Sequence, residues 1–239
     1  MSPRARIFLK SQTECSTTRP ALLVLKLSVF PHEGECFSSV DMGYKAGLNE
    51  ESERQIRMEC EFALCFEAFL TQRERSLYID YKLQYAKEDF LRFLVRNFGY
   101  LLHGSPRDVL FPQPANDNAK SFGNANAVYA VNDPAVAIFF AIFDRQRFNC
   151  RTVSSKCDSS GRTVSYKFQL PGAVIKMNPW GSGVVHIISS DRFEQGRSDN
   201  GGALLSEWRS PENVAVWAKL PVTPSDFRFL QDVSPLDND

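Results

Sequence analysis

The chain has 239 residues, of which 43% are hydrophobic and 23% are charged, and this composition is typical of a globular protein with one large domain. It carries 28 Lys and Arg residues against 28 Asp and Glu residues, so its formal net charge is zero. A balanced charge does not support general electrostatic attraction to nucleic acid, which depends on an excess of basic side chains. A local basic patch is still compatible with this composition, so nucleic acid is not excluded as a partner.

The six cysteines form no Cys-x-x-Cys pair, and their spacing fits neither a zinc module nor the disulfide framework of a small secreted domain. We therefore expect no metal and a reducing, intracellular compartment, namely the cytoplasm, or a host cytoplasm if the protein is an effector. An apolar run at residues 21–25 follows a basic N-terminus, but Lys26 interrupts it and no small-residue cleavage site follows, so no secretory signal is predicted. No run approaches the roughly 18 apolar residues of a membrane span, and no membrane partner is expected.

The N-terminal part of the sequence predicts one strand followed by two helices. Residues 1–20 lack hydrophobic periodicity and are expected to form a loose arm, residues 23–29 alternate as in a half-buried strand, and residues 31–48 are typical of a loop. A helix is expected to begin at Asn49, a favourable N-cap that three glutamates follow at the positive end of the helix dipole. Residues 77–98 predict a second helix, because aromatic and leucine side chains recur there at helical spacing.

The C-terminal part predicts mainly strands. An apolar strand that begins at Tyr100 is expected to end at His103, and a polar loop follows at residues 111–127. An apolar helix is expected at residues 135–143, and a variable linker comes after it. Alternating apolar residues predict the further strands, which are residues 164–170 with a continuation over 173–177, residues 183–188 and residues 214–222. Strands after a helical block indicate an α+β fold rather than a doubly wound parallel sheet.

Three short motifs stand at strand ends in this C-terminal part. His103 and Gly104 follow an apolar strand, so an imidazole is expected beside a backbone that no side chain crowds. Tyr129 ends a second apolar strand just before an Asp-Pro helix start, which would bring an aromatic face to the mouth of a cleft. Glu207 stands next to Trp208, ahead of the last predicted strand.

The order of histidine-glycine, tyrosine and late glutamate resembles the His-Tyr-Glu class of the ADP-ribosyltransferase fold, which includes the poly(ADP-ribose) polymerases and the diphtheria-type toxins. The resemblance covers residues 100–227, about half of the chain. It implies a split antiparallel sheet whose cleft holds NAD as a substrate. It also implies an N-terminal region, residues 1–98, with an arm, a strand and helices packed on the core, and an ADP-ribosyltransferase-like domain at residues 99–239.

The resemblance implies a role for each motif residue. The family histidine hydrogen-bonds an adenosine ribose hydroxyl and the glycine backbone clamps the nicotinamide carboxamide, so these roles fall on His103 and Gly104, with Ser105 adding a hydroxyl. The family tyrosine stacks on the nicotinamide ring, which assigns that contact to Tyr129. The family glutamate bonds the ribose 2′-hydroxyl and stabilises positive charge as the nicotinamide bond breaks, which assigns the catalytic carboxylate to Glu207.

The chemistry of the reaction suits these side chains independently. Cleavage of the nicotinamide–ribose bond creates an oxocarbenium-like centre, and a fixed carboxylate in a poorly hydrated cleft opposes that charge. Nicotinamide in NAD is a flat cationic ring, so an aromatic face attracts it. Its carboxamide needs a donor and an acceptor in line, which an uncrowded backbone supplies.

Two positions depart from the polymerase pattern. Polymerase-type members carry a carboxamide-binding serine and then a second tyrosine after the first, and the corresponding residues here are Ala137 and Phe140. Phe140 keeps an aromatic face in the cofactor site, whereas Ala137 has no hydroxyl. We therefore expect a divergent mono-ADP-ribosyltransferase that modifies a macromolecular acceptor, most readily a protein.

Each motif residue also has a structural interpretation: His103 as a satisfied strand-end histidine, Tyr129 as a core tyrosine, and Glu207 as a solvated glutamate with Glu212 competing for its place. On the same fold, an NAD glycohydrolase would use water as the acceptor, and an inactive module would bind NAD or ADP-ribose without turnover. An RNA 2′-phosphotransferase-like site should show a cluster of arginines and histidines, but the chain has three histidines. Glycine-rich dinucleotide, nucleophile-elbow and metalloprotease motifs are absent from the sequence.

Overall fold

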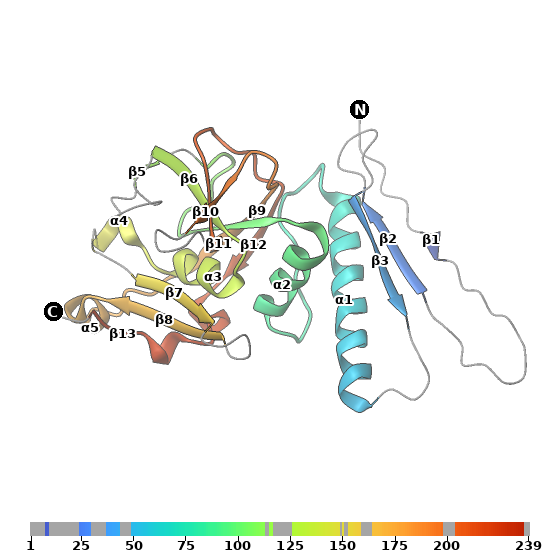
Figure 1. Cartoon of the computed structure of the whole chain (residues 1–239), viewed down its shortest axis with the longest axis horizontal. Coiled ribbons are helices and arrows are strands. Elements are labelled where there is room, and N and C mark those ends of the chain that lie inside the picture. Colours follow the sequence, from blue (N-terminus) through green and yellow to red (C-terminus); the bar gives the residue numbers. More distant parts are fainter. Residues whose placement is uncertain are drawn as a thin grey trace, which may run out of the picture.

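The computed structural model describes residues 8–9, 24–29, 37–43, 49–112, 115–116, 126–148, 150, 153–158, 164–197 and 204–236 (Figure 1). Its helices are α1 (Glu50–Gln72), α2 (Lys87–Phe98), α3 (Pro134–Ile142), α4 (Arg145–Phe148) and α5 (Gly172–Lys176), with short 3-10 turns η2 (Pro224–Asp226) and η3 (Leu230–Asp232). Its strands are β1 (Phe8–Leu9), β2 (Val24–Val29), β3 (Phe37–Gly43), β4 (Leu101–Ser105), β5 (Ala115–Asn116), β6 (Asn126–Val131), β7 (Val153–Asp158), β8 (Val164–Leu170), β9 (Gly183–Ile188), β10 (Glu194–Arg197), β11 (Leu204–Ser210), β12 (Ala218–Val222) and β13 (Ser234–Pro235).

The central element is an antiparallel sheet in the order β10-β11-β6-β4-β9-β12, with β5 paired to β6. Two smaller sheets accompany it. One has the order β1-β2-β3, and the other has the order β13-β8-β7, in which β13 runs parallel to β8. Helices from the N-terminal half followed by a predominantly antiparallel sheet confirm the predicted α+β class.

Helix α3 packs closely on one face of the central sheet because two strand positions there are glycine. A Cβ added to Gly104 would lie 1.9 Å from the carbonyl oxygen of Ala137, and one added to Gly183 would lie 1.8 Å from that of Ala141. Real side chains never approach so closely. Glycine in β4 and in β9 is therefore required for the helix to reach this distance, which places α3 directly over the strand that carries His103.

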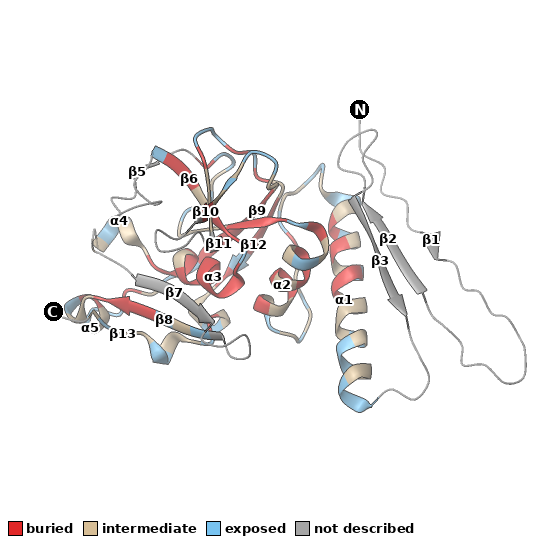
Figure 2. Ribbon diagram, viewed as in Figure 1, coloured by how far each residue is buried: buried red, intermediate tan, exposed pale blue. Residues whose placement is uncertain are grey.

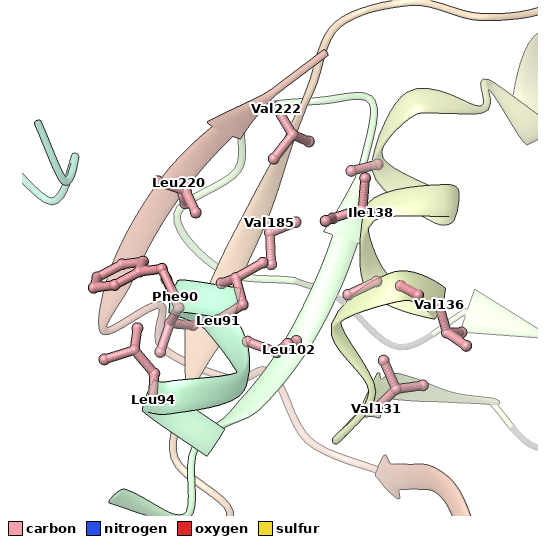
Figure 3. Packing of buried hydrophobic residues seen from close by; sticks show 14 of the residues in the cluster. Phe90, Leu91, Leu94, Leu102, Val131, Val136, Ile138, Val185, Leu220 and Val222 are labelled. Atoms are coloured by element: carbon pink, nitrogen blue, oxygen red, sulfur yellow. The ribbon is translucent and has the colours of Figure 1, made fainter. Parts of the chain in front are cut away.

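The main hydrophobic core fills the space between this sheet face and helices α1, α2 and α3. Figure 3 shows Leu91 and Leu94 of α2 and Ile138 of α3 converging on the strands. Helices α1 and α2 meet through aromatic rings, with the Phe62 and Phe90 centroids 5.5 Å apart in an edge-on arrangement. Figure 2 shows the buried residues concentrated on α3, β9 and the facing sides of α1 and α2.

Several local predictions are confirmed. Asn49 caps α1, because its side chain accepts a hydrogen bond from the N–H of Ser52 at 2.9 Å. Asp133 caps α3 through the N–H of Ala135 at 3.0 Å, and Pro134 takes the first helical position, as the Asp-Pro pair predicts. Strands β8 and β9 have the predicted bounds, and β2 begins one residue later than predicted.

The prediction of the second helix is partly wrong. Residues 77–86 are not helical, and the helix begins at Lys87. The segment instead pairs with β12, since the N–H of Lys219 donates to the Leu77 carbonyl at 2.7 Å and the N–H of Ile79 donates to the Lys219 carbonyl at 2.9 Å. Hydrogen bonds to a strand that is distant in sequence override the helical spacing.

Two predicted strands also differ from the structure. Residues 173–177 were expected to continue a strand, but α5 forms there after Pro171, whose carbonyl accepts the N–H of Ile175 at 3.1 Å. The last strand, expected over residues 214–222, shortens to β12. The backbone N–H groups of Val214 and Val216 donate to the 110–112 segment and not to the sheet.

Some segments predicted as loop contain regular structure. The 31–48 loop includes β3, the linker at residues 144–161 includes α4 and β7, and the 111–127 loop includes β5. Of the predicted N-terminal arm, only β1 lies within the described residues, where it pairs with β2. None of the helices in the described part of the chain has the length and apolar character that crossing a membrane requires.

Candidate active site

The strands that carry the three motifs are neighbours in the central sheet. β11 carries Glu207, β6 carries Tyr129 and β4 carries His103, in the order β11-β6-β4. The register pairs Glu207 with Val131 and Val131 with Leu102. Tyr129 is two residues from Val131, and His103 is one residue from Leu102. The motif residues, which are far apart in the sequence, therefore lie close together on neighbouring strands.

Strands β4 and β6 have a much shorter ladder than β4 and β9. Within their described bounds β4 and β6 share one register pair, Leu102 with Val131, whereas β4 and β9 share five, from Leu101–Ile188 to Ser105–Val184. The β4–β6 ladder therefore does not extend to Gly104. The pairing between the two strands therefore ends beside the candidate site.

The ring of His103 crosses from β4 to the backbone of β6. Its Nδ1 lies 2.7 Å from the carbonyl oxygen of Tyr129. A carbonyl can only accept a hydrogen bond, so Nδ1 carries the proton and Nε2 keeps a lone pair. Burial lowers the pKa of His103, and the bond to Tyr129 opposes this shift only in part. The imidazole is therefore neutral at pH 7 and offers Nε2 as an acceptor.

Alternation along the strands assigns the motif side chains to two faces of the sheet. Leu102 and Val131 belong to the core beneath α3, and Glu207 and Tyr129 share their face by register and period. His103 follows Leu102 and so points to the opposite face, where its ring lies 5.8 Å from that of His186. The structure thus brings Tyr129 and Glu207 to one face and connects His103 to them through the Tyr129 backbone.

The two candidate glutamates differ in their surroundings. Glu207 is half-buried within β11, one strand from the motif tyrosine. Glu212 lies beyond the end of that strand, is 62% exposed and forms an ion pair with Arg192 at 2.8 Å. Of the two glutamates, Glu207 is thus the more buried, and Glu212 is the one already paired with an arginine in solvent.

The other predicted site residues have defined local partners. Ser105 accepts a hydrogen bond from the N–H of Arg107 at 3.1 Å, which closes the turn after β4. Ala137 is fully buried, and its carbonyl faces Gly104. Phe140 is half-buried on α3, and the guanidinium carbon of Arg145 lies 5.7 Å from its ring centre.

A second group of polar residues lies on the His103 face of the sheet. His186 of β9 is fully buried, with Nδ1 3.2 Å from the His103 carbonyl and Nε2 3.3 Å from the N–H of Val109. Burial and the neighbouring His103 lower the pKa of His186 to about 4. Lys219 of β12, also buried, bonds to Asp108. Burial raises the pKa of Asp108, but the hydrogen bonds from Lys219 and from Tyr78 outweigh burial and lower it.

Three polar residues of this group were not predicted from the sequence, namely His186, Lys219 and Asp108. A signal existed, because His186 and Lys219 are polar residues inside otherwise apolar strands. Buried polar residues of this kind need partners. The sequence did not identify those partners, because Asp108 lies in a loop that is far from both residues along the chain.

A cavity of about 300 Å³ opens at the start of α2, between residues 81–89 and residues 225–228, and none of the three motif residues lines it. Within the described ranges no group of three or more His, Cys, Asp or Glu residues could hold a metal ion.

Comparison of the chain with protein-family models, with curated proteins and with solved structures found no match.

Proposed function

We propose that the protein is a NAD-dependent mono-ADP-ribosyltransferase, with the β10-β11-β6-β4-β9-β12 sheet serving as the split sheet of that fold. The enzyme would cleave the nicotinamide–ribose bond of NAD and transfer ADP-ribose to a macromolecular acceptor, for which a protein is the first choice. The observation that carries this proposal is the adjacency of the three motif strands at the point where the β4–β6 ladder ends.

Each motif residue offers a group suited to NAD. The neutral His103 presents Nε2 as an acceptor for a ribose hydroxyl. The backbone at Gly104 lies beyond the end of the β4–β6 ladder and can pair with a planar carboxamide in the plane of the sheet, while α3 covers the side on which a Cβ would project. Tyr129 supplies an aromatic face for the cationic ring.

In the proposed reaction Glu207 acts electrostatically. The bond between nicotinamide nitrogen and ribose C1′ breaks, the bonding pair leaves with neutral nicotinamide, and positive charge develops on the ribose. The Glu207 carboxylate accepts the 2′-hydroxyl hydrogen bond and stabilises that charge. A nucleophile on the acceptor then forms the new bond to C1′ and releases its proton. With water as the nucleophile, the same steps give the alternative NAD glycohydrolase.

A second candidate function is a binding module for NAD or ADP-ribose without turnover. The observation that favours it is the orientation of His103, which points to the sheet face opposite Tyr129 and Glu207. A ligand that contacts all three must therefore reach both faces of the sheet. If the strands hold NAD only from one side, binding without bond cleavage follows.

Incubation with NAD distinguishes these functions. Free nicotinamide is measured with and without candidate protein acceptors, and NAD affinity is measured in parallel by calorimetry. Nicotinamide release that depends on an acceptor supports the transferase, and release without one supports the glycohydrolase. Affinity without release at high enzyme concentration supports the binding module. If NAD neither binds nor reacts, the proposal is wrong.

The Glu207→Gln variant tests the catalytic assignment. Its nicotinamide release should fall on the order of 10²–10³-fold with NAD binding retained, because the carboxylate is needed most as charge develops. His103→Ala and Tyr129→Ala should weaken NAD binding as well, since both would contact NAD before the bond breaks.

Glu212→Gln is the matched control, because it removes a carboxylate from an exposed position in the same region. It should retain full activity. Loss of activity in Glu212→Gln with full activity in Glu207→Gln would move the catalytic role to Glu212.

A further inference from the structure

The side chain of Arg209 lies on the same sheet face as the proposed catalytic carboxylate. Arg209 pairs in register with Tyr129, and Glu207 precedes it by two residues on β11. Side chains two residues apart on a strand share a face and lie roughly 7 Å apart. Within the described bounds of β4, β6 and β11, Arg209 is the only arginine or lysine.

Arg209 is held by a carboxylate from the neighbouring strand. Its Nε and Nη2 both donate to one oxygen of Glu194, at 3.2 and 3.1 Å, across the β10–β11 ladder. The Nε–Nη2 edge is the edge that grips carboxylate or phosphate oxygens. Glu194 is 69% exposed and Arg209 is 30% exposed, and an ion pair with an exposed carboxylate is readily exchanged for another anion.

The charges on this face of the sheet are complementary to the charges along NAD. Glu207 supplies the negative charge opposite the ribose that becomes positive, and Arg209 supplies a positive charge one pleat repeat further along the strand. In NAD a phosphate is attached to that same ribose through its 5′ oxygen, so the diphosphate lies on one side of the reacting carbon.

We infer that Arg209 binds the diphosphate of the dinucleotide and that Glu194 occupies the phosphate position when no nucleotide is bound. This inference rests on the proposed function. It adds a residue that selects for nucleotides over uncharged ribosides, and it makes Glu194 a competitor of the ligand.

The inference predicts opposite effects for the two partners of one ion pair. In Arg209→Gln, NAD affinity should fall on the order of 10–100-fold, because a charged hydrogen-bond donor to the diphosphate is lost. In Glu194→Gln, NAD affinity should rise, because the Glu194 carboxylate no longer competes for the guanidinium. If the Arg209–Glu194 ion pair only stabilised the pairing of β10 with β11, both variants would change NAD affinity in the same direction, or neither would change it.

The experiment measures NAD affinity of the full-length protein by calorimetry, with inorganic pyrophosphate as a competing probe. Arg209→Lys is included because it keeps the positive charge but removes the paired N–H donors of the guanidinium. Arg192→Gln is the matched control, because it removes a nearby exposed arginine that is also paired with a carboxylate. Pyrophosphate should compete with NAD in the wild type, more strongly in Glu194→Gln, and least in Arg209→Gln. Arg192→Gln should match the wild type.

Two outcomes overturn the inference in different ways. Suppose that the wild type binds NAD, but that Arg209→Gln binds NAD and pyrophosphate as well as the wild type does, or that Glu194→Gln binds them more weakly than the wild type does. Arg209 is then not the residue that binds the diphosphate, and the proposed function is unaffected. If the wild type does not bind NAD, the proposed function fails and the inference fails with it.

Discussion

The central sheet has two halves that meet where the β4–β6 ladder ends, and they differ in how their polar residues are buried. In the inner half (β4, β9 and β12) every residue of β9 is buried, and His186 and Lys219 have protein partners. In the outer half (β6, β11 and β10) Tyr129, Glu207 and Arg209 are half-buried and Glu194 is exposed. Polar groups sealed in the interior serve the fold, whereas half-exposed groups can exchange their partners for a ligand.

The largest expected effect on folding concerns His186 in the inner half. Its pKa is about 4 in the folded protein against 6.5 for an ordinary histidine. Between these values the unfolded chain binds a proton that the folded chain does not. The free energy of unfolding should therefore be fully retained above pH 6.5 and fall by up to about 3 kcal/mol towards pH 4.

Urea denaturation at pH 7 and at pH 4.5 measures this loss. His186→Gln should show a smaller difference between the two pH values than the wild type, although His103, whose pKa is also lowered, retains part of the dependence. An unchanged difference in the variant would show that His186 does not titrate in this way and that the inner half is more hydrated than its burial indicates.

An intermediate effect is expected for glycine under α3. Gly183→Ala should destabilise the protein by about 1–3 kcal/mol, because the new Cβ would meet the Ala141 carbonyl and the helix would have to move. Gly181→Ala is the matched control, since no atom lies within 4 Å of a Cβ added there. Equal denaturation midpoints for the two variants would mean that α3 does not depend on a close approach to β9.

The smallest effect is expected for the exposed ion pair beside the outer half. Arg192 and Glu212 are 70% and 62% exposed, so Arg192→Gln should change the free energy of unfolding by less than about 0.5 kcal/mol. Thermal unfolding at two salt concentrations measures it. A larger loss would remove the contrast between the two halves and would also disqualify Arg192→Gln as a control for Arg209.

Local chemistry in the sequence was sufficient for the elements whose hydrogen bonds stay within the element. Asn49 and the Asp133-Pro134 pair specified where α1 and α3 begin, because a cap and a proline act on the adjacent turn. The apolar run of β9 specified a buried strand. The order of His103, Tyr129 and Glu207 singled out residues whose strands prove to be neighbours, but β11, which carries Glu207, was not predicted as a strand.

The tertiary structure decided whatever depends on a distant partner. Residues 77–79 are not helical because the Lys219 backbone hydrogen-bonds to them. The Lys219 side chain can be buried because its ammonium group pairs with the Asp108 carboxylate. The faces of the motif side chains follow from register, which reverses every side chain when it shifts by one residue. The sequence therefore indicated candidate residues and located the strands of His103 and Tyr129, but not the strand of Glu207. Strand pairing alone determined that His103 lies on one face and Tyr129, Glu207 and Arg209 on the other, because hydrogen bonds between strands fix the register.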